Sequence, residues 1–162
     1  MFRDEIIERA KNEKIYLSFD MDGVLAEYNV SNGDEHRSHV SNVYLSKRPI
    51  MTIIDWIKDI MQYANIEIGI LSNCYFREHK KEKIEWLHKY LPELKQENIH
   101  IICYEDIEME YVDKFSLKKD FLEREFAGKK YTVYHIDDDI RIIKRLKDSS
   151  TAHPVHISSL LV

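Results

Sequence analysis

The chain has 162 residues, of which 44% are hydrophobic and 33% are charged, and its formal net charge is −5. This length and composition predict a single globular domain, spanning residues 1–162, with a full hydrophobic core. The acidic balance leaves no basic surplus, so we expect no bulk nucleic-acid partner.

The cysteines and the apolar runs bear on where the protein works. Cys74 and Cys103 are the two cysteines, too few for a disulfide framework and without the spacing of a zinc site. They favour a reducing, cytoplasmic environment. No run approaches about 18 consecutive apolar residues, and the amino terminus does not resemble a signal peptide, so we expect no membrane association.

Helix-like and strand-like segments alternate along the chain. Apolar residues at helical spacing indicate the helices, and short apolar runs indicate the strands. Such alternation predicts parallel pairing through right-handed crossovers, hence a Rossmann-like, three-layer α/β/α sandwich with about five parallel strands. The predicted helices cover 3–11, 50–64, 78–91, 116–126 and 139–147, and the predicted strands cover 14–20, 66–72, 99–103, 131–136 and 154–157.

One segment, 26–48, breaks this alternation because it is polar, dotted with aromatic residues and without clear periodicity. A loop of this length inside a compact domain is usually functional or mobile. Since it begins directly after an acidic turn, we predict that it forms a small lid or cap. His36, Arg37 and His39 are candidates to touch a substrate there, although mobile surface residues are the commoner case.

Two carboxylates, Asp20 and Asp22, follow the first predicted strand and precede Gly23. Alternate side chains of an extended strand share a face, so both are expected to point the same way. Two carboxylates this close repel unless a cation lies between them, and oxygen ligands favour Mg²⁺. An ordinary acidic turn is the alternative explanation.

Polar side chains also follow the other predicted strands. Ser72 and Asn73 end the second strand, three carboxylates occupy 137–139 at the end of the fourth, and Lys118 and Lys119 begin the preceding helix. The carboxyl ends of parallel strands line the ligand crevice of an open sheet. These side chains are therefore expected at one edge of the sheet.

These motifs resemble those of the haloacid dehalogenase superfamily of phosphohydrolases. The resemblance rests on 19–24 (Phe-Asp-Met-Asp-Gly-Val), 71–73 (Leu-Ser-Asn), a lysine at 118 or 119, and 136–138 (Ile-Asp-Asp). Within the superfamily the chain looks most similar to the 5′(3′)-deoxyribonucleotidases, on the residues at 20–26, 82–87 and 136–139. The resemblance implies a magnesium-dependent phosphomonoester hydrolase for a small phosphorylated substrate, such as a nucleoside monophosphate.

The resemblance also implies roles for particular residues. Asp20 is expected to be the nucleophile that forms an aspartyl-phosphate, and Asp22 the general acid and base whose backbone carbonyl binds Mg²⁺. Ser72 and the lysine are expected to hold the phosphoryl oxygens. Asp137 or Asp138 is expected to complete the metal site.

Some assignments remain open at this stage. Helical phase does not choose between Lys118 and Lys119 as the phosphate ligand, Lys114 is a third candidate, and the resemblance favours Lys118. Asn73 is expected to assist Ser72 with the phosphate. His135 is interpreted as a packed strand residue, Asp139 as a helix cap, Cys74 as a possible pocket residue, and Trp56 and Trp86 as core residues.

The short lid departs from the nucleotidases and leaves other functions open. About twenty-three residues separate the predicted acidic turn from the next helix. They favour a bulkier or non-nucleotide phosphorylated substrate, or a lid completed by another subunit, and they do not decide between a monomer and a dimer. A catalytically inactive binding module is a further alternative. A receiver-type phosphoacceptor domain is disfavoured, because the third strand ends in Cys103 and Tyr104 rather than in an acceptor aspartate.

Overall fold

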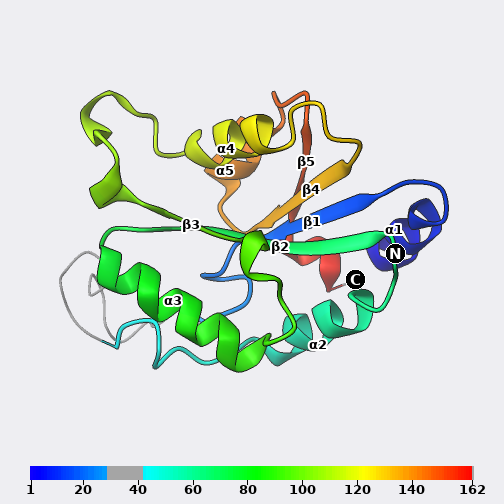
Figure 1. Cartoon of the computed structure of the whole chain (residues 1–162), viewed down its shortest axis with the longest axis horizontal. Helices are drawn as coiled ribbons and strands as arrows, with labels where there is room; N and C mark the ends of the chain where they lie inside the picture. Colours follow the sequence, from blue (N-terminus) through cyan, green and yellow to red (C-terminus); the bar gives the residue numbers. More distant parts are fainter. Residues whose placement is uncertain (29–41, 162) are drawn as a thin grey trace.

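The computed structural model describes residues 1–28 and 42–161, which form a sheet of five parallel strands in the order β3-β2-β1-β4-β5. Each strand pairs in parallel with its neighbour, and β1 lies at the centre of the sheet (Figure 1). The strands are β1 (Ile15–Phe19), β2 (Ile66–Cys74), β3 (Ile99–Cys103), β4 (Thr132–Asp137) and β5 (Ala152–His156).

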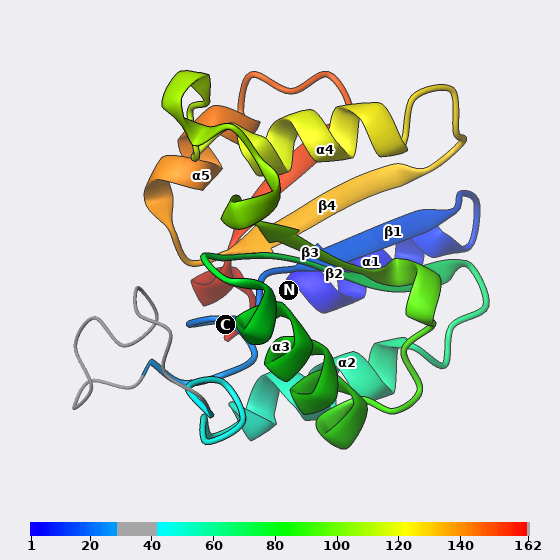
Figure 2. The same cartoon turned by 60° about the vertical axis from the view of Figure 1, so that its left-hand side comes forward.

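Helices cover both faces of this sheet. Helices α4 and α5 lie on one face and α2 and α3 on the other, as both views show (Figures 1 and 2). The structure thereby confirms the predicted α/β sandwich with five parallel strands. The α-helices are α1 (Phe2–Ala10), α2 (Met51–Ile60), α3 (Arg77–Tyr90), α4 (Leu117–Glu125) and α5 (Ile140–Leu146), and the 3₁₀ helices are η3 (Gln96–Asn98), η4 (Tyr104–Asp106), η5 (Met109–Tyr111) and η6 (Ile157–Leu160).

The boundaries differ from the predicted ones at a few places. Helix α2 ends at Ile60 rather than at residue 64, because Met61 and the residues after it turn towards β2. Strand β2 continues to Cys74, where it pairs in register with the end of β3. This extension carries Asn73 to the rim of the sheet.

Two separate apolar clusters fill the space between the sheet and its helices. One contains Ile53 and Ile57 of α2 and Trp86 of α3, and the other contains Leu122 of α4 and Leu146 of α5. All five residues of β1 are buried, as expected for a central strand covered on both faces. Trp86 is 1% exposed, and Trp56 packs partly buried against the first cluster, so both are the core residues predicted.

The strand order changes direction at the centre of the sheet, although all strands remain parallel. The chain passes from β1 to β2 and β3 on one side and then to β4 and β5 on the other side. In open parallel sheets a crevice forms where the carboxyl ends of two such strands diverge. The ends of β1 and β4, at Phe19 and Asp137, flank this point.

The described parts of the predicted lid pack against α3. The Glu82 carboxylate accepts hydrogen bonds from the backbone N–H groups of Asn42 (2.6 Å) and Tyr44 (2.9 Å). His36, Arg37 and His39 lie outside the described residues. In the ranges that are described, no helix has the length and apolar character needed to cross a membrane.

Candidate active site

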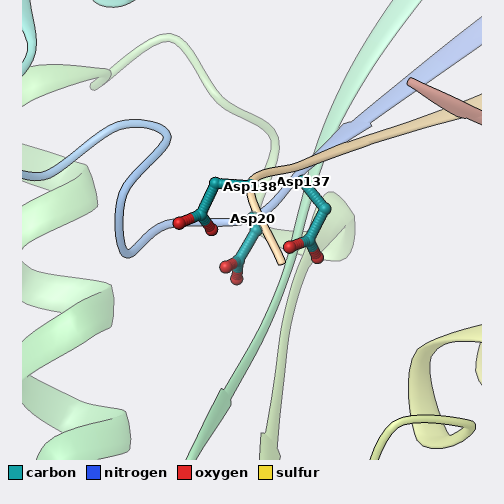
Figure 3. Close-up of side chains that lie close together, drawn as sticks. All are labelled: Asp20, Asp137 and Asp138. Atoms are coloured by element: carbon teal, nitrogen blue, oxygen red, sulfur yellow. The ribbon is translucent and has the colours of Figure 1, made fainter. Parts of the chain in front are cut away.

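Three carboxylates gather where β1 and β4 end (Figure 3). Asp20 follows β1, Asp137 ends β4 and Asp138 comes next, and one oxygen from each lies within 4.8 Å of the others. Phe19 is paired in register with Ile136, which brings the two strand ends together. We refer to these three aspartates as the carboxylate cluster.

Lys118 of α4 neutralises part of this charge. Its ammonium lies 2.9 Å from Asp20 Oδ1 and 2.7 Å from Asp137 Oδ2, and the residue is 1% exposed. Burial alone would lower the pKa of Lys118, but the two carboxylates outweigh it and raise the pKa above its usual value. The lysine is therefore a fixed cation at the site.

The other predicted lysines do not reach the cluster. Lys119 pairs with Glu123 on the outer side of α4, 3.0 Å away. Lys114 lies over the ring of Phe115, 5.2 Å from its centre. The structure thus brings Lys118 alone of the three candidates to the aspartates.

A buried hydrogen-bond network holds Asp137 in place. His135 Nε2 is 3.1 Å from Asp137 Oδ2, and His135 Nδ1 is 2.9 Å from the hydroxyl of Ser18. The backbone N–H of Asp139 donates to Asp137 Oδ1 at 2.8 Å. Burial would raise the pKa of Asp137, but Lys118 and His135 hold it well below its usual range, so the carboxylate is ionised.

His135 was predicted to be a packed strand residue and Asp139 a helix cap. His135 is a fully buried strand residue, and burial lowers its pKa so that the neutral ring is favoured. It also supports a member of the carboxylate cluster, a contact that its place in the sequence did not indicate. Asp139 caps α5 as predicted, because its side chain accepts a hydrogen bond from the backbone N–H of Arg141.

Asp138 has unused capacity to bind a cation. Its Oδ2 accepts from the Tyr28 hydroxyl at 2.8 Å, whereas its Oδ1 is buried without a hydrogen-bond partner in the described structure. Burial and the neighbouring charges of Asp20 and Asp137 raise the pKa of Asp138. Three carboxylates face one lysine, and oxygen donors of this kind suit Mg²⁺. The residues present therefore fit a magnesium ion.

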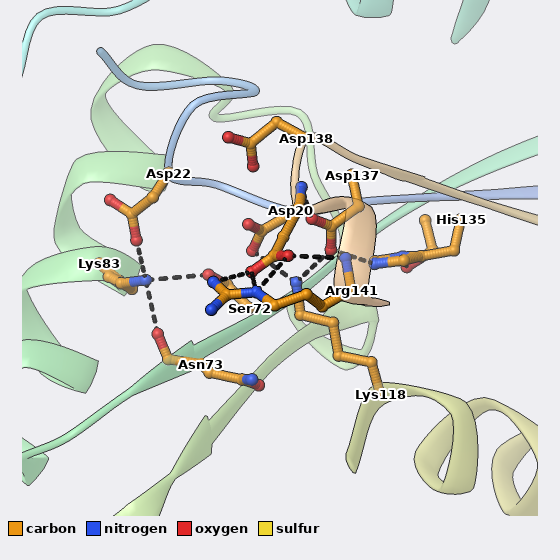
Figure 4. Close-up of polar contacts among 12 residues, drawn as sticks. Asp20, Asp22, Ser72, Asn73, Lys83, Lys118, His135, Asp137, Asp138 and Arg141 are labelled. Atoms are coloured by element: carbon orange, nitrogen blue, oxygen red, sulfur yellow. Dashed lines mark hydrogen bonds and ion pairs between the residues drawn. The ribbon is translucent and has the colours of Figure 1, made fainter. Parts of the chain in front are cut away.

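A second charged group surrounds Asp22 (Figure 4). Lys83 Nζ donates to Asp22 Oδ2 (2.6 Å), to the Ser72 hydroxyl (2.9 Å) and to the backbone carbonyl of Asn73 (2.8 Å). Lys47 donates to the other oxygen of Asp22. We call Asp22, Lys47 and Lys83 the lysine cluster, because its cations outnumber its carboxylate.

The lysine cluster keeps Asp22 ionised. Burial would raise the pKa of Asp22, but Lys83 and Lys47 together lower it to about 2. The same carboxylate raises the pKa of Lys83 despite full burial. A carboxylic acid with so low a pKa is a poor proton donor near neutral pH.

This arrangement corrects the expectation that Asp20 and Asp22 share a cation. The extended backbone ends at Phe19, and the N–H groups of Leu25 and Ala26 both bond to the carbonyl of Met21 (2.8 and 2.9 Å). The chain therefore turns between the two aspartates. Asp22 does not belong to the described carboxylate group that could hold a metal.

Gly23 makes this turn possible. Its φ is +74°, a conformation that residues with a Cβ atom rarely adopt. A Cβ atom here would also collide with the carboxylate of Asp138 and the ring of Tyr28. The glycine thus allows the turn after β1 to lie against the carboxylate cluster.

Sequence reasoning did not assign Lys47, Lys83 or Tyr28 to the site, although Lys83 lies in the segment 82–87 on which the nucleotidase resemblance rested. Lys83 precedes Trp86 by three residues and Leu87 by four, so helical spacing places it on the buried face of α3. A lysine on such a face was the available signal. Tyr28 and Lys47 belong to the segment 26–48, which has no clear periodicity, and nothing in the sequence singles them out.

Ser72 and Asn73 lie beside the lysine cluster, as their place after the second strand predicted. The Ser72 hydroxyl accepts from Lys83, and the Asn73 side-chain amide donates to the Tyr104 hydroxyl at 3.2 Å. Asn73 Oδ1 is buried and has no partner among the described residues. Cys74 is buried and donates to the backbone carbonyl of Phe76, at 3.4 Å, so it does not face an open pocket.

Two of the solved structures with this fold contain the Pnkp1/Rnl/Hen1 complex, which one of them names as an RNA repair complex. A chain in the structure of the Pnkp1/Rnl/Hen1 complex superposes with a TM-score of 0.65 and 16% identity, over 90% of this chain and 46% of that one. A chain in the structure of the Pnkp1/Rnl/Hen1 RNA repair complex gives a TM-score of 0.60 and 16% identity, over 89% and 42%. This chain spans less than half the length of either. No family model and no curated protein matches the sequence.

These findings correct the predicted family and its activity. Two fold neighbours are chains of the Pnkp1/Rnl/Hen1 complex, and none of these comparisons supports the haloacid dehalogenase superfamily, a deoxyribonucleotidase or an inactive module of that family. A phosphatase for small phosphorylated molecules is likewise unsupported, and the exclusion of nucleic acid was wrong. The four motifs are short, and acids, small polar residues and lysines at one sheet edge suit many doubly wound folds.

Proposed function

We propose that the chain is a magnesium-dependent enzyme that acts on the phosphorylated end of an RNA strand. The observation that carries the proposal is the pairing of the two clusters at one edge of the sheet. The carboxylate cluster has excess negative charge, whereas the lysine cluster has excess positive charge. A metal ion and a phosphoryl group need this pair of neighbouring environments.

In this proposal Asp20, Asp137 and Asp138 hold the metal ion. Mg²⁺, when bound, supplies positive charge that polarises a phosphoryl oxygen. Lys118 keeps the Asp20 and Asp137 carboxylates apart from bulk water and fixes their orientation, since it contacts both. His135 fixes the position of Asp137, because it hydrogen-bonds to the same carboxylate oxygen that Lys118 contacts.

The lysine cluster is proposed to bind the phosphate. Lys47 and Lys83 share one carboxylate, so one positive charge remains for an anion. The Ser72 hydroxyl is bonded to Lys83 and stands beside the same position. Asp22 holds the two ammonium groups in place, and its low pKa argues for this orienting role.

The choice of RNA as the substrate class is supported by the neighbouring structures. They share the fold over about nine-tenths of this chain and belong to an RNA repair complex. The net charge of −5 is more compatible with an enzyme that binds one end of a strand than with a protein that binds along a long duplex. We also propose a cytoplasmic location, since Cys74 and Cys103 are both free thiols.

The test uses short RNA strands with defined ends. Strands with a 5′-phosphate, a 3′-phosphate or only hydroxyl ends are incubated with protein and Mg²⁺, with and without EDTA, and their ends are analysed by mass spectrometry. We expect one phosphorylated end to be altered by the wild type. Asp20→Asn should slow this by about a hundredfold or more, because a charge at the site is lost. Asp120→Asn, an exposed aspartate of α4, is the matched control.

Two outcomes contradict the proposal. Equal reaction by the wild type and Asp20→Asn means that the carboxylate cluster is not the reacting site. Equal reaction on mononucleotides and on RNA strands means that RNA is not the preferred substrate. Mass spectrometry of the product also shows whether the phosphoryl group is removed or transferred.

A further inference from the structure

A cavity of about 190 Å³ adjoins the two clusters at the carboxyl edge of the sheet. It lies beyond the end of β2, beside η4 and the start of α5. Asp139, which follows the carboxylate cluster directly, also borders it. The residues that the argument uses are Asn73, Tyr75, Tyr104, Lys114, Phe115 and Arg141.

Aromatic rings and cations alternate around this cavity. The rings of Tyr75 and Tyr104 meet edge to face with centres 5.0 Å apart. The Arg141 guanidinium lies over the ring of Phe115, 4.5 Å from its centre, and Lys114 lies over the same ring. Interleaved aromatic and basic side chains bind single-stranded nucleic acid, because bases stack on the rings and phosphates pair with the cations.

Asn73 adds an acceptor that lacks a partner. Its Oδ1 is buried and makes no hydrogen bond in the described structure, while its side-chain amide donates to Tyr104. Buried polar atoms are usually paired, so an unpaired acceptor beside a cavity indicates a bound donor. The backbone carbonyl of Asn73 bonds to Lys83. One residue therefore joins the cavity to the lysine cluster.

The size of the cavity limits what it can hold. Pockets for drug-sized ligands usually measure about 300 to 1,000 Å³, and this one is smaller. It therefore suits one planar base better than a whole nucleotide or a folded partner. Arg141 is exposed and paired with Asp139 at 2.7 Å, so its guanidinium plane is held near the cavity.

We propose that this cavity is a nucleoside subsite. It takes the base of the nucleotide that carries the terminal phosphate, while that phosphate lies at the lysine cluster. The base stacks on Tyr104 and Phe115, and Asn73 Oδ1 accepts a hydrogen bond from the nucleoside. Lys114 and Arg141 pair with the next phosphate of the strand. This subsite rests on the proposed function for its terminal phosphate.

Binding of RNA lacking a single base tests the subsite. Fluorescence anisotropy measures the dissociation constant of a labelled RNA strand with a terminal phosphate, in EDTA so that its ends stay unchanged. Two companion strands lack one base, either at the phosphorylated end or in the middle. We expect loss of the end base to weaken binding about tenfold, the order of one base stack, and loss of the middle base to matter much less.

Protein variants connect this effect to the cavity. Tyr104→Ala should weaken binding of the intact strand about tenfold and add little to the loss from the missing end base, because both remove the same contact. Tyr104→Phe keeps the ring and should bind nearly as the wild type does. Tyr111→Ala is the matched control, since this tyrosine is 84% exposed and does not line the cavity. If Tyr104→Ala fails to fold, Phe115→Ala replaces it.

The outcomes separate this inference from the proposed function. Equal binding of the intact strand and the strand without its end base overturns the subsite, even if the wild type alters RNA ends. Additive losses from Tyr104→Ala and the missing base overturn it as well. Base-dependent binding that disappears with Tyr104→Ala supports the subsite, even if no RNA end reacts and the proposed reaction fails.

Discussion

The two charged clusters contain the same residue types in opposite proportions. The carboxylate cluster has three aspartates, two of which contact Lys118, whereas the lysine cluster places Lys47 and Lys83 around Asp22. Both are largely buried, so neither charge excess is fully screened by water. The comparison teaches that one sheet edge can hold an excess of negative charge and an excess of positive charge side by side.

The largest expected effect comes from removing the lysine of the carboxylate cluster. Lys118→Met leaves Asp20 and Asp137 buried without their partner and should lower the free energy of unfolding by about 3–5 kcal/mol. Added Mg²⁺ should restore part of this, since a cation can replace the lost charge. Urea denaturation with and without Mg²⁺ measures both effects.

Lys119→Met is the control for this change. Lys119 forms a surface ion pair with Glu123, so its loss should leave the stability nearly unchanged. If Lys118→Met were as stable as Lys119→Met, the carboxylate cluster would not depend on Lys118 for its charge balance.

Removing a lysine from the lysine cluster should lower the free energy of unfolding by less. In Lys83→Met, Asp22 keeps its contact with Lys47, but Ser72 and the carbonyl of Asn73 lose a donor. We expect a loss of about 1–3 kcal/mol. Mg²⁺ should not restore it, because the cluster remains without excess negative charge. Lys81→Met, on the exposed side of α3, serves as the control, and rescue of Lys83→Met by Mg²⁺ would contradict the comparison.

Metal binding should stabilise the wild type by a smaller amount. At a free Mg²⁺ concentration ten times its dissociation constant, linkage predicts about 1.4 kcal/mol, seen as a higher melting temperature. Asp138→Asn should abolish most of this gain, since Asp138 Oδ1 is the unpaired oxygen of the carboxylate cluster. Asp22→Asn should retain it. Equal loss in both variants would mean that the metal lies between the clusters.

The smallest effect concerns pH and lies outside both clusters. Burial lowers the pKa of His100 below its usual 6.5, so the folded state favours the neutral ring. The unfolded chain then binds more protons, and stability is lost as pH falls below about 6.5. Thermal melts of His100→Gln should show a weaker fall over this range than the wild type. Identical pH profiles would show that His100 does not contribute.

Hydrophobic patterning was enough to predict the fold. The continuous apolar run of β1 indicates a strand buried on both faces, and the helical spacing of Ile53, Ile57 and Ile60 indicates a helix with one buried face. Strand ends then share an edge as a consequence of parallel pairing. For that reason Asp20, Asp137 and Lys118 could be expected near one another before the structure was known.

Sequence patterns could not predict the lysine cluster or identify the family. Lys83 meets Asp22 across 61 positions of sequence and Lys47 meets it across 25, so only the folded chain brings them together. The turn at Gly23 also breaks the strand alternation on which the prediction for Asp22 depended. Short motifs at strand ends describe a sheet edge, and they do not by themselves identify a family.

Two of the lysines at these clusters come from opposite layers of the sandwich. Lys83 belongs to α3 and Lys118 to α4. These two helices lie on opposite faces of the sheet (Figure 2). Each layer packs on the sheet through its own apolar cluster. A partly folded chain with only one helical layer docked would lack either Lys83 or Lys118, and with it one of the two clusters. If both proposed ligands bind together, their joint binding would therefore require that both layers have folded onto the sheet.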